Sequence, residues 1–125
     1  MKTKLFAALL CAMCITLVGC KNEPKNKLCG TVWGGRVAYT DVEATFSTNT
    51  DCSIDLRGYA TGSGIGTYII KDSKAIVTIQ STTGDFDGQA KKGDVFECPF
   101  SLENNTMEVT LYNGKVTATL IRRQQ

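Results

Sequence analysis

Apolar and polar residues alternate with a period of two along most of the chain from Leu28 onward. The runs are short and are separated by glycine, asparagine, aspartate and serine, which is the pattern of half-buried strands joined by tight turns. No stretch of this region has the 3.6-residue period of an amphipathic helix. The alternation predicts about eight strands, at residues 32–39, 42–46, 52–59, 66–70, 75–79, 96–102, 107–111 and 116–120.

About eight short strands in roughly 100 residues predict an all-β fold, either a sandwich or a single antiparallel up-and-down β-barrel. We expect the barrel, because nearly every strand has one apolar face and closure removes exposed sheet edges. Pro99 cannot donate to a strand ladder, so the barrel is expected to be partly open there. Bulky residues expected to point inward favour a filled interior: Phe46, Leu56, Ile69, Val77, Phe96, Phe100, Met107 and Leu111.

The N-terminal pattern is different. Two lysines precede an apolar run at residues 5–18, which is too short to span a bilayer as a stable helix but has the size of a secretory h-region. Leu17-Val18-Gly19-Cys20 resembles the bacterial lipobox. This resemblance implies a cleaved lipoprotein signal peptide over residues 1–19 and a lipidated Cys20 that carries acyl chains such as palmitate. The alternatives are an ordinary cleaved signal and an uncleaved anchor helix.

Residues 20–27 are polar and predict a lipidated tether, which leaves residues 28–125 for the barrel domain. Lys21 differs from the aspartate that retains some lipoproteins at the inner membrane. We therefore expect a lipid anchor in the outer membrane, with the periplasmic and surface leaflets both open. Removal of residues 1–19 leaves 106 residues with 12 basic and 12 acidic side chains. This neutral balance argues against nucleic acid as a partner.

Three cysteines follow Cys20, an odd number for an oxidising compartment. One pair and one leftover thiol is the simplest arrangement. Cys52 and Cys98 both fall on the apolar face of their strands and form a possible disulfide across the interior. Cys29 is an alternative partner for either, and all three can also be buried as small hydrophobic residues.

The first predicted strand carries a family resemblance. The segment Gly30-Thr31-Val32-Trp33 is similar to the Gly-x-Trp signature of lipocalins and the wider calycin barrels, with one extra residue. The chain resembles the short lipocalin-like lipoproteins of Bacteroidetes-type bacteria. The resemblance implies that Trp33 plugs one barrel end and that a basic residue after the last strand, Arg122 or Arg123, packs across it.

A second resemblance concerns the segment from Ser63 to Tyr68. It is similar to the Ser-Gly-x-x-Tyr strand of the membrane-bound inhibitors of c-type lysozyme, although Tyr68 comes one residue late. This similarity implies that Ser63 and Tyr68 are contact residues of an inhibitor. Glycines in this segment are also explained by backbone geometry alone.

The chain contains no histidine, so the commonest general base and metal ligand is missing. Asp85, Asp87 and Asp94 could collect a hard cation, but they lack the spacing of a calcium loop. We expect neither an enzyme nor a cofactor or metal site. The expected function is a binding module for a small apolar ligand or a protein partner, with the ligand entering opposite Trp33 past residues 62–66 or 81–94. The alternative is a structural or inhibitory envelope protein.

Overall fold

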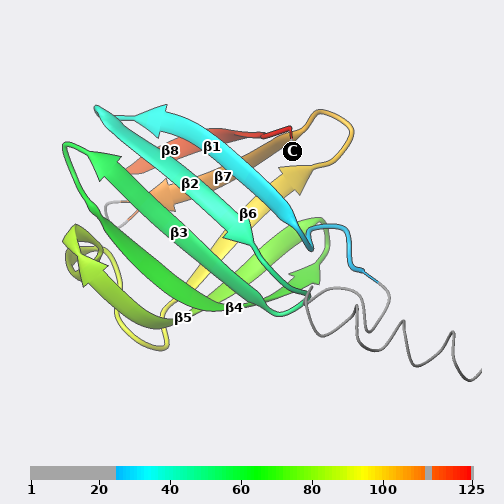
Figure 1. Ribbon diagram of the computed structural model, residues 1–125, viewed down its shortest axis with the longest axis horizontal. Coiled ribbons are helices and arrows are strands. Elements are labelled where there is room, and N and C mark those ends of the chain that lie inside the picture. The colour runs from blue at the N-terminus through cyan, green and yellow to red at the C-terminus, as the bar shows by residue number, and fades with distance from the viewer. Residues whose placement is uncertain (1–24, 112–113, 125) are drawn as a thin grey trace, which may run out of the picture.

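The computed structural model describes residues 25–111 and 114–124, which form a closed antiparallel β-barrel. Each strand pairs with the next one along the chain, and β8 returns to pair with β1 (Figure 1). The strands are β1 (Thr31–Val37), β2 (Thr40–Phe46), β3 (Asp51–Gly58), β4 (Gly62–Lys71), β5 (Lys74–Gly84), β6 (Val95–Ser101), β7 (Thr106–Leu111) and β8 (Val116–Arg122). The prediction of an all-β, eight-stranded up-and-down barrel is confirmed, and this barrel is compatible with a lipocalin-like fold.

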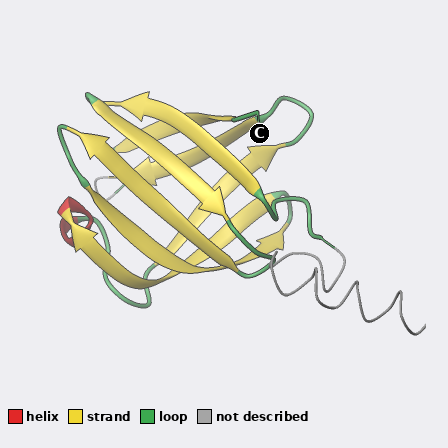
Figure 2. Ribbon diagram, viewed as in Figure 1, coloured by secondary structure: helices red, strands yellow, loops and turns green. Residues whose placement is uncertain are grey.

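The helical content of the described residues is one short 3₁₀ helix, η1 (Asp85–Gly88), between β5 and β6 (Figure 2). No helix in this part of the chain is long and apolar enough to cross a membrane. The predicted signal peptide at residues 1–19 and the predicted lipidation site Cys20 lie outside the described residues.

The up-and-down topology gives the barrel two ends. The near end is where β1 begins; it also holds residues 47–50, residues 72–73 and residues 102–105. The far end is made by residues 38–39, residues 59–61 and the segment 85–94 that contains η1. The far end therefore includes the 81–94 region that was expected opposite Trp33, and Trp33 lies near the start of β1.

The interior is filled by apolar side chains from all eight strands. Trp33, Phe46, Phe86, Leu56 and Ile79 are at most 1% exposed. One predicted inward residue is wrong: Ile69 is 63% exposed, and its neighbour Tyr68 points inward instead. The alternation in β4 buries Gly64, Gly66 and Tyr68 and leaves Ile65, Thr67 and Ile69 exposed.

The barrel is weakly joined beside Pro99, as expected for a residue without a backbone N–H group. The β6–β7 ladder contains only the pairs Phe100↔Met107 and Ser101↔Thr106, although β6 begins at Val95. A surface hollow of about 320 Å³ lies between β6 and β7 on the far-end side of Pro99. It is lined in part by Phe96, Glu97 and Thr110. The expected opening is thus a local split in an otherwise closed barrel.

Candidate functional site

Trp33 is fully buried near the near end of the barrel. Its indole N–H donates to the hydroxyl of Thr31 at 2.9 Å, and the Thr31 hydroxyl in turn donates to the carbonyl of Leu28. Leu28 is also fully buried and precedes β1. This chain of contacts satisfies the indole and seals the near end with the protein's own side chains.

The two arginines after the last strand are both exposed, and they lie differently. Arg122 is the register partner of Trp33 on β8 and lines a surface hollow of about 380 Å³. Arg123 lies on the outer surface, where its Nε is 3.5 Å from Oε2 of Glu43. A Cβ at Gly34 would collide with the Arg123 guanidinium. Because glycine has no side chain, Arg123 has the space to lie across β1 at this position. Arg123 therefore braces the β1–β8 closure from outside.

A polar network around Asn26 fastens residues 26–29 to the near end. Its Oδ1 accepts from the backbone N–H groups of Leu28 and Cys29 at 2.9 and 2.8 Å. Its Nδ2 donates to the carbonyl of Asn49 at 3.0 Å and to the Tyr68 hydroxyl at 3.1 Å. Asn26, a residue of the expected tether, is thus bonded to the near end of the barrel.

Tyr68 is 3% exposed, and its hydroxyl donates to the carbonyl of Thr48 at 2.6 Å. Burial raises the pKa of this hydroxyl, and the hydrogen bond with Asn26 acts in the opposite direction. Ser63 lies on the outer face of the same strand, where its hydroxyl donates to Asp55. Ser63 and Tyr68 therefore face opposite sides of the sheet, and the structure does not bring them together as contact residues of an inhibitor.

The far end is closed by Phe86 of η1, a residue that lies outside all the predicted strands. Phe86 is fully buried, and its ring packs 6.1 Å from that of Phe96, measured between centroids. A Cβ at Gly64 would lie 2.5 Å from Cε1 of Phe86, so this glycine is needed for the ring to enter. The signal that could have found Phe86 is a lone aromatic residue between two aspartates that are themselves flanked by glycines.

The three carboxylates considered for a cation accept hydrogen bonds from neighbouring residues of the far end instead. Asp85 accepts from the N–H of Thr61 at 2.7 Å, Asp87 accepts from the hydroxyl of Thr82, and Asp94 accepts from the N–H of Lys91 at 3.0 Å. Groups of three or more potential metal-ligating side chains are not found among the described residues. The aspartates act as turn-forming residues.

Cys52 and Cys98 are buried, free thiols, so the disulfide considered between them is not formed. Burial raises the pKa of each thiol to about 12. Because Cys52 and Cys98 are free, the alternative pairing of Cys29 with either of them is also wrong for this structure. The apolar strand face predicted burial of the two thiols, and burial alone accounts for their positions.

Comparison of the chain with protein-family models, with curated proteins and with solved structures found no match.

Proposed function

We propose that this protein is a lipid-anchored envelope lipoprotein whose lipocalin-like barrel is a non-enzymatic binding module for a protein partner. The anchor part of the proposal is supported by the lipobox-like sequence that ends at Cys20, and it places the protein at the outer membrane. The non-enzymatic part is supported by the lack of histidine and by the loop aspartates, which accept hydrogen bonds from their own chain.

The observation that favours a protein partner over a small apolar ligand is the occupied interior. Trp33 and Leu28 fill the near end, and Phe86 fills the far end, each fully buried. A small eight-stranded barrel can either be packed by its own side chains or hold one small ligand. A fatty-acid-sized ligand would have to displace a core aromatic ring, and losing such a ring from a core costs about 3–5 kcal/mol. The outer surface is therefore the better place for recognition.

A probe titration tests this proposal directly. A naphthalene-sulfonate or fluorescent fatty-acid probe is titrated into the purified full-length protein and into a Phe86→Ala variant. We expect no saturable binding by the folded wild-type protein. Binding by the Phe86→Ala variant is expected only where the probe can enter the space that the phenyl ring filled. Saturable binding to the wild-type protein, with competition by an unlabelled fatty acid, would overturn the preference for a protein partner.

Mass spectrometry of the protein purified from its own membrane tests the anchor. After signal cleavage, Cys20 is the one cysteine left in the chain besides Cys29, Cys52 and Cys98. A thioether to diacylglycerol and a disulfide cannot share one sulfur atom. Diacylglycerol on Cys20 supports the anchor, whereas a disulfide between Cys20 and Cys29 in the purified protein would contradict it.

Fractionation provides the matched functional test. We expect Cys20→Ala to release the protein from the membrane fraction, because the acyl chains are attached through that thiol alone. Cys52→Ala, which changes a buried thiol of the barrel, is the control and should leave the protein in the membrane fraction. A Cys20→Ala protein that stays with the membrane after a salt wash would show that the lipobox interpretation is wrong.

A further inference from the structure

The two most exposed large apolar residues of the described chain are both tyrosines at the far end. Tyr39 is 79% exposed in the turn between β1 and β2, and Tyr59 is 85% exposed in the loop between β3 and β4. Both loops lie at the same end of the barrel (Figure 1). Exposed single apolar residues are common, but two neighbouring aromatic side chains on one tip form a candidate contact surface.

The turn that carries Tyr39 is strained. Ala38 and Tyr39 have φ values of 49° and 62°, and Val37 pairs with Thr40, which makes a two-residue hairpin turn with both central residues in the left-handed region. Such turns favour asparagine and glycine, because other residues in this region lose roughly 1 kcal/mol or more. An exposed tyrosine recovers none of that energy through core packing. Strain without a folding benefit points to a role outside the fold.

Hydrogen bonds hold the two tyrosines in a fixed relation. The backbone N–H of Tyr59 donates to the carbonyl of Tyr39 at 3.1 Å, and the N–H of Ala60 donates to the buried hydroxyl of Thr40 at 3.2 Å. Gly58, with a φ of 125°, allows this close approach, because a Cβ there would lie 2.6 Å from the Tyr39 carbonyl oxygen. The two side chains are thus displayed from backbones that are already ordered before binding, which lowers the entropic cost of recognition.

The same support extends to η1. Asp85 exchanges two hydrogen bonds with the backbone of Thr61, one from its own N–H at 2.8 Å and one to its carboxylate at 2.7 Å. The turn with Tyr39, the loop with Tyr59 and the helix that inserts Phe86 are therefore one connected structure. Phe86 points into the barrel from it, while the tyrosines are exposed.

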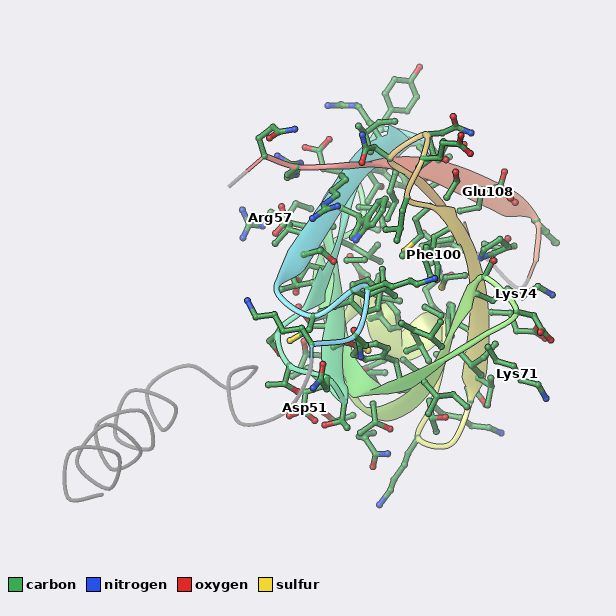
Figure 3. All side chains as sticks on the ribbon, turned by 90° about the vertical axis from the view of Figure 1, so that its right-hand side faces the viewer. Asp51, Arg57, Lys71, Lys74, Phe100 and Glu108 are labelled. Atoms are coloured by element: carbon green, nitrogen blue, oxygen red, sulfur yellow. The ribbon has the colours of Figure 1, made fainter. Side chains whose placement is uncertain are left out.

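The charged side chains beside the two tyrosines indicate which charge the partner surface carries. Arg36 pairs with Asp41 across strands β1 and β2 at 3.5 Å. Arg57 lies opposite Asp41 on β3, has no ion pair among those of the described residues, and points outward from the barrel wall (Figure 3). Tyrosine and arginine are the residue types that most often dominate binding energy at protein interfaces. The pair of rings fits an apolar cleft, and Arg57 fits an acidic side chain at its border.

We propose that Tyr39 and Tyr59 are the anchor residues with which the far end docks into an apolar cleft of a partner protein, and that Arg57 pairs with a carboxylate of that partner. This proposal rests on the proposed function, because it names the surface through which the binding module acts. It assigns recognition to the far end of the barrel, whereas Asn26, which follows the predicted lipidation site in the sequence, is bonded at the near end.

Site-specific photo-crosslinking in the native membrane tests the proposal on the full-length protein. A benzophenone amino acid replaces Tyr39 or Tyr59 in separate variants, and replaces Ile69 or Ile121 in the controls. These control residues are 63% and 52% exposed on the barrel wall. We expect the same partner protein to be crosslinked from both tyrosine positions and not from the wall. A crosslink that is equally strong from the wall positions, or none from the tip, would overturn the proposal.

The partner identified in this way is then purified and titrated against the protein in detergent. Tyr39→Ser and Tyr59→Ser should each weaken binding about 30-fold or more, the loss expected of interface hot spots. Arg57→Gln should weaken binding and reduce its salt dependence, because it removes the charge that pairs with the carboxylate. Ile69→Ser should leave the affinity unchanged. Unchanged affinity of both tyrosine variants would overturn the proposal.

Sedimentation with purified cell-wall sacculi separates a sugar-binding role from a protein-binding role. The tyrosine rings could stack on a glycan, so binding to sacculi that both tyrosine variants lose would overturn the proposal of a protein partner at this tip. The probe titration described above is independent of these variants. If the wild-type protein does not bind the probe and no partner is crosslinked from Tyr39 or Tyr59, this inference is rejected. The proposed function then still stands, with recognition by another part of the outer surface.

Discussion

The two ends of the barrel use tyrosine in opposite ways. At the near end Tyr68 is buried, and its hydroxyl is bonded to Thr48 and Asn26. At the far end Tyr39 and Tyr59 are exposed, and the interactions that hold their loops are made by the backbone. The near end satisfies its polar groups internally, which is what stability requires of a buried end. The far end leaves large aromatic side chains to solvent, which is what recognition requires.

The two-residue turns of the molecule repeat this contrast. Asp72 and Ser73 join β4 to β5 at the near end with φ values of 52° and 62°, nearly the values of Ala38 and Tyr39. Aspartate and serine are usual turn residues, and aspartate tolerates the left-handed region. Alanine and tyrosine do not share this tolerance. The same backbone geometry is therefore accompanied by suitable side chains at the near end and by unsuitable ones at the far end.

The largest effect is expected from Trp33→Ala at the near end. Truncation of this fully buried residue should lower the free energy of unfolding by about 3–5 kcal/mol, because it leaves a cavity and removes a packed ring. Tyr39→Ala at the far end should change it by no more than about 0.5 kcal/mol. Urea denaturation of both variants measures the difference. A Trp33→Ala protein with unchanged stability would remove the plug role and the comparison between the ends.

The next effect concerns the hydrogen-bond network around Asn26 at the near end. Asn26→Ala deletes a side chain that makes hydrogen bonds to two backbone N–H groups, to a carbonyl and to Tyr68, and should cost about 1–3 kcal/mol. Tyr68→Phe is the matched control, because it removes one member of the network and keeps the ring packed 4.8 Å from Phe46. We expect it to cost less than Asn26→Ala. Equal stability of the Asn26→Ala and wild-type proteins would show that residues 26 and 27 are only a tether.

The strands were predictable because their core faces alternate, but the two features that shape the far end were not. The turn at Ala38-Tyr39 was placed inside a strand, since neither residue is a turn former. Phe86 lies outside the predicted strands, and its burial depends on the space above Gly64, more than 20 residues away in sequence. At the near end, the seal by Asn26 could not be predicted either, because it joins segments that only the closed barrel brings together. Local pattern predicts strands; the contacts that close the ends are non-local.

The strained turn offers a gain of stability. Ala38→Asn places a residue that tolerates the left-handed region at the first turn position and keeps Tyr39, so it should stabilise the protein by roughly 0.5–1 kcal/mol. Asp72→Asn is the matched control at the corresponding position of the near-end turn and should be nearly neutral, because aspartate is already suitable there. Thermal unfolding of both variants tests the contrast. If Ala38→Asn destabilises the protein, the turn is not strained in the way that the backbone angles indicate.

The last prediction concerns the buried thiols, whose reactivity reports how tightly the near half of the barrel is closed. Cys52 and Cys98 are 4% and 1% exposed, so a thiol reagent at neutral pH should label neither in the native protein and both after unfolding. Asn26→Ala should speed their labelling by local opening, and Tyr39→Ala should not.

Because burial raises the pKa of both thiols to about 12, the unfolded chain releases thiol protons at a lower pH than the folded protein does. Stability should therefore fall as the pH rises from about 9 towards 12, and the Cys52→Ala/Cys98→Ala double variant should lose less over the same range. Rapid labelling of native thiols, or an identical alkaline loss in the double variant, would show that the near end is not sealed.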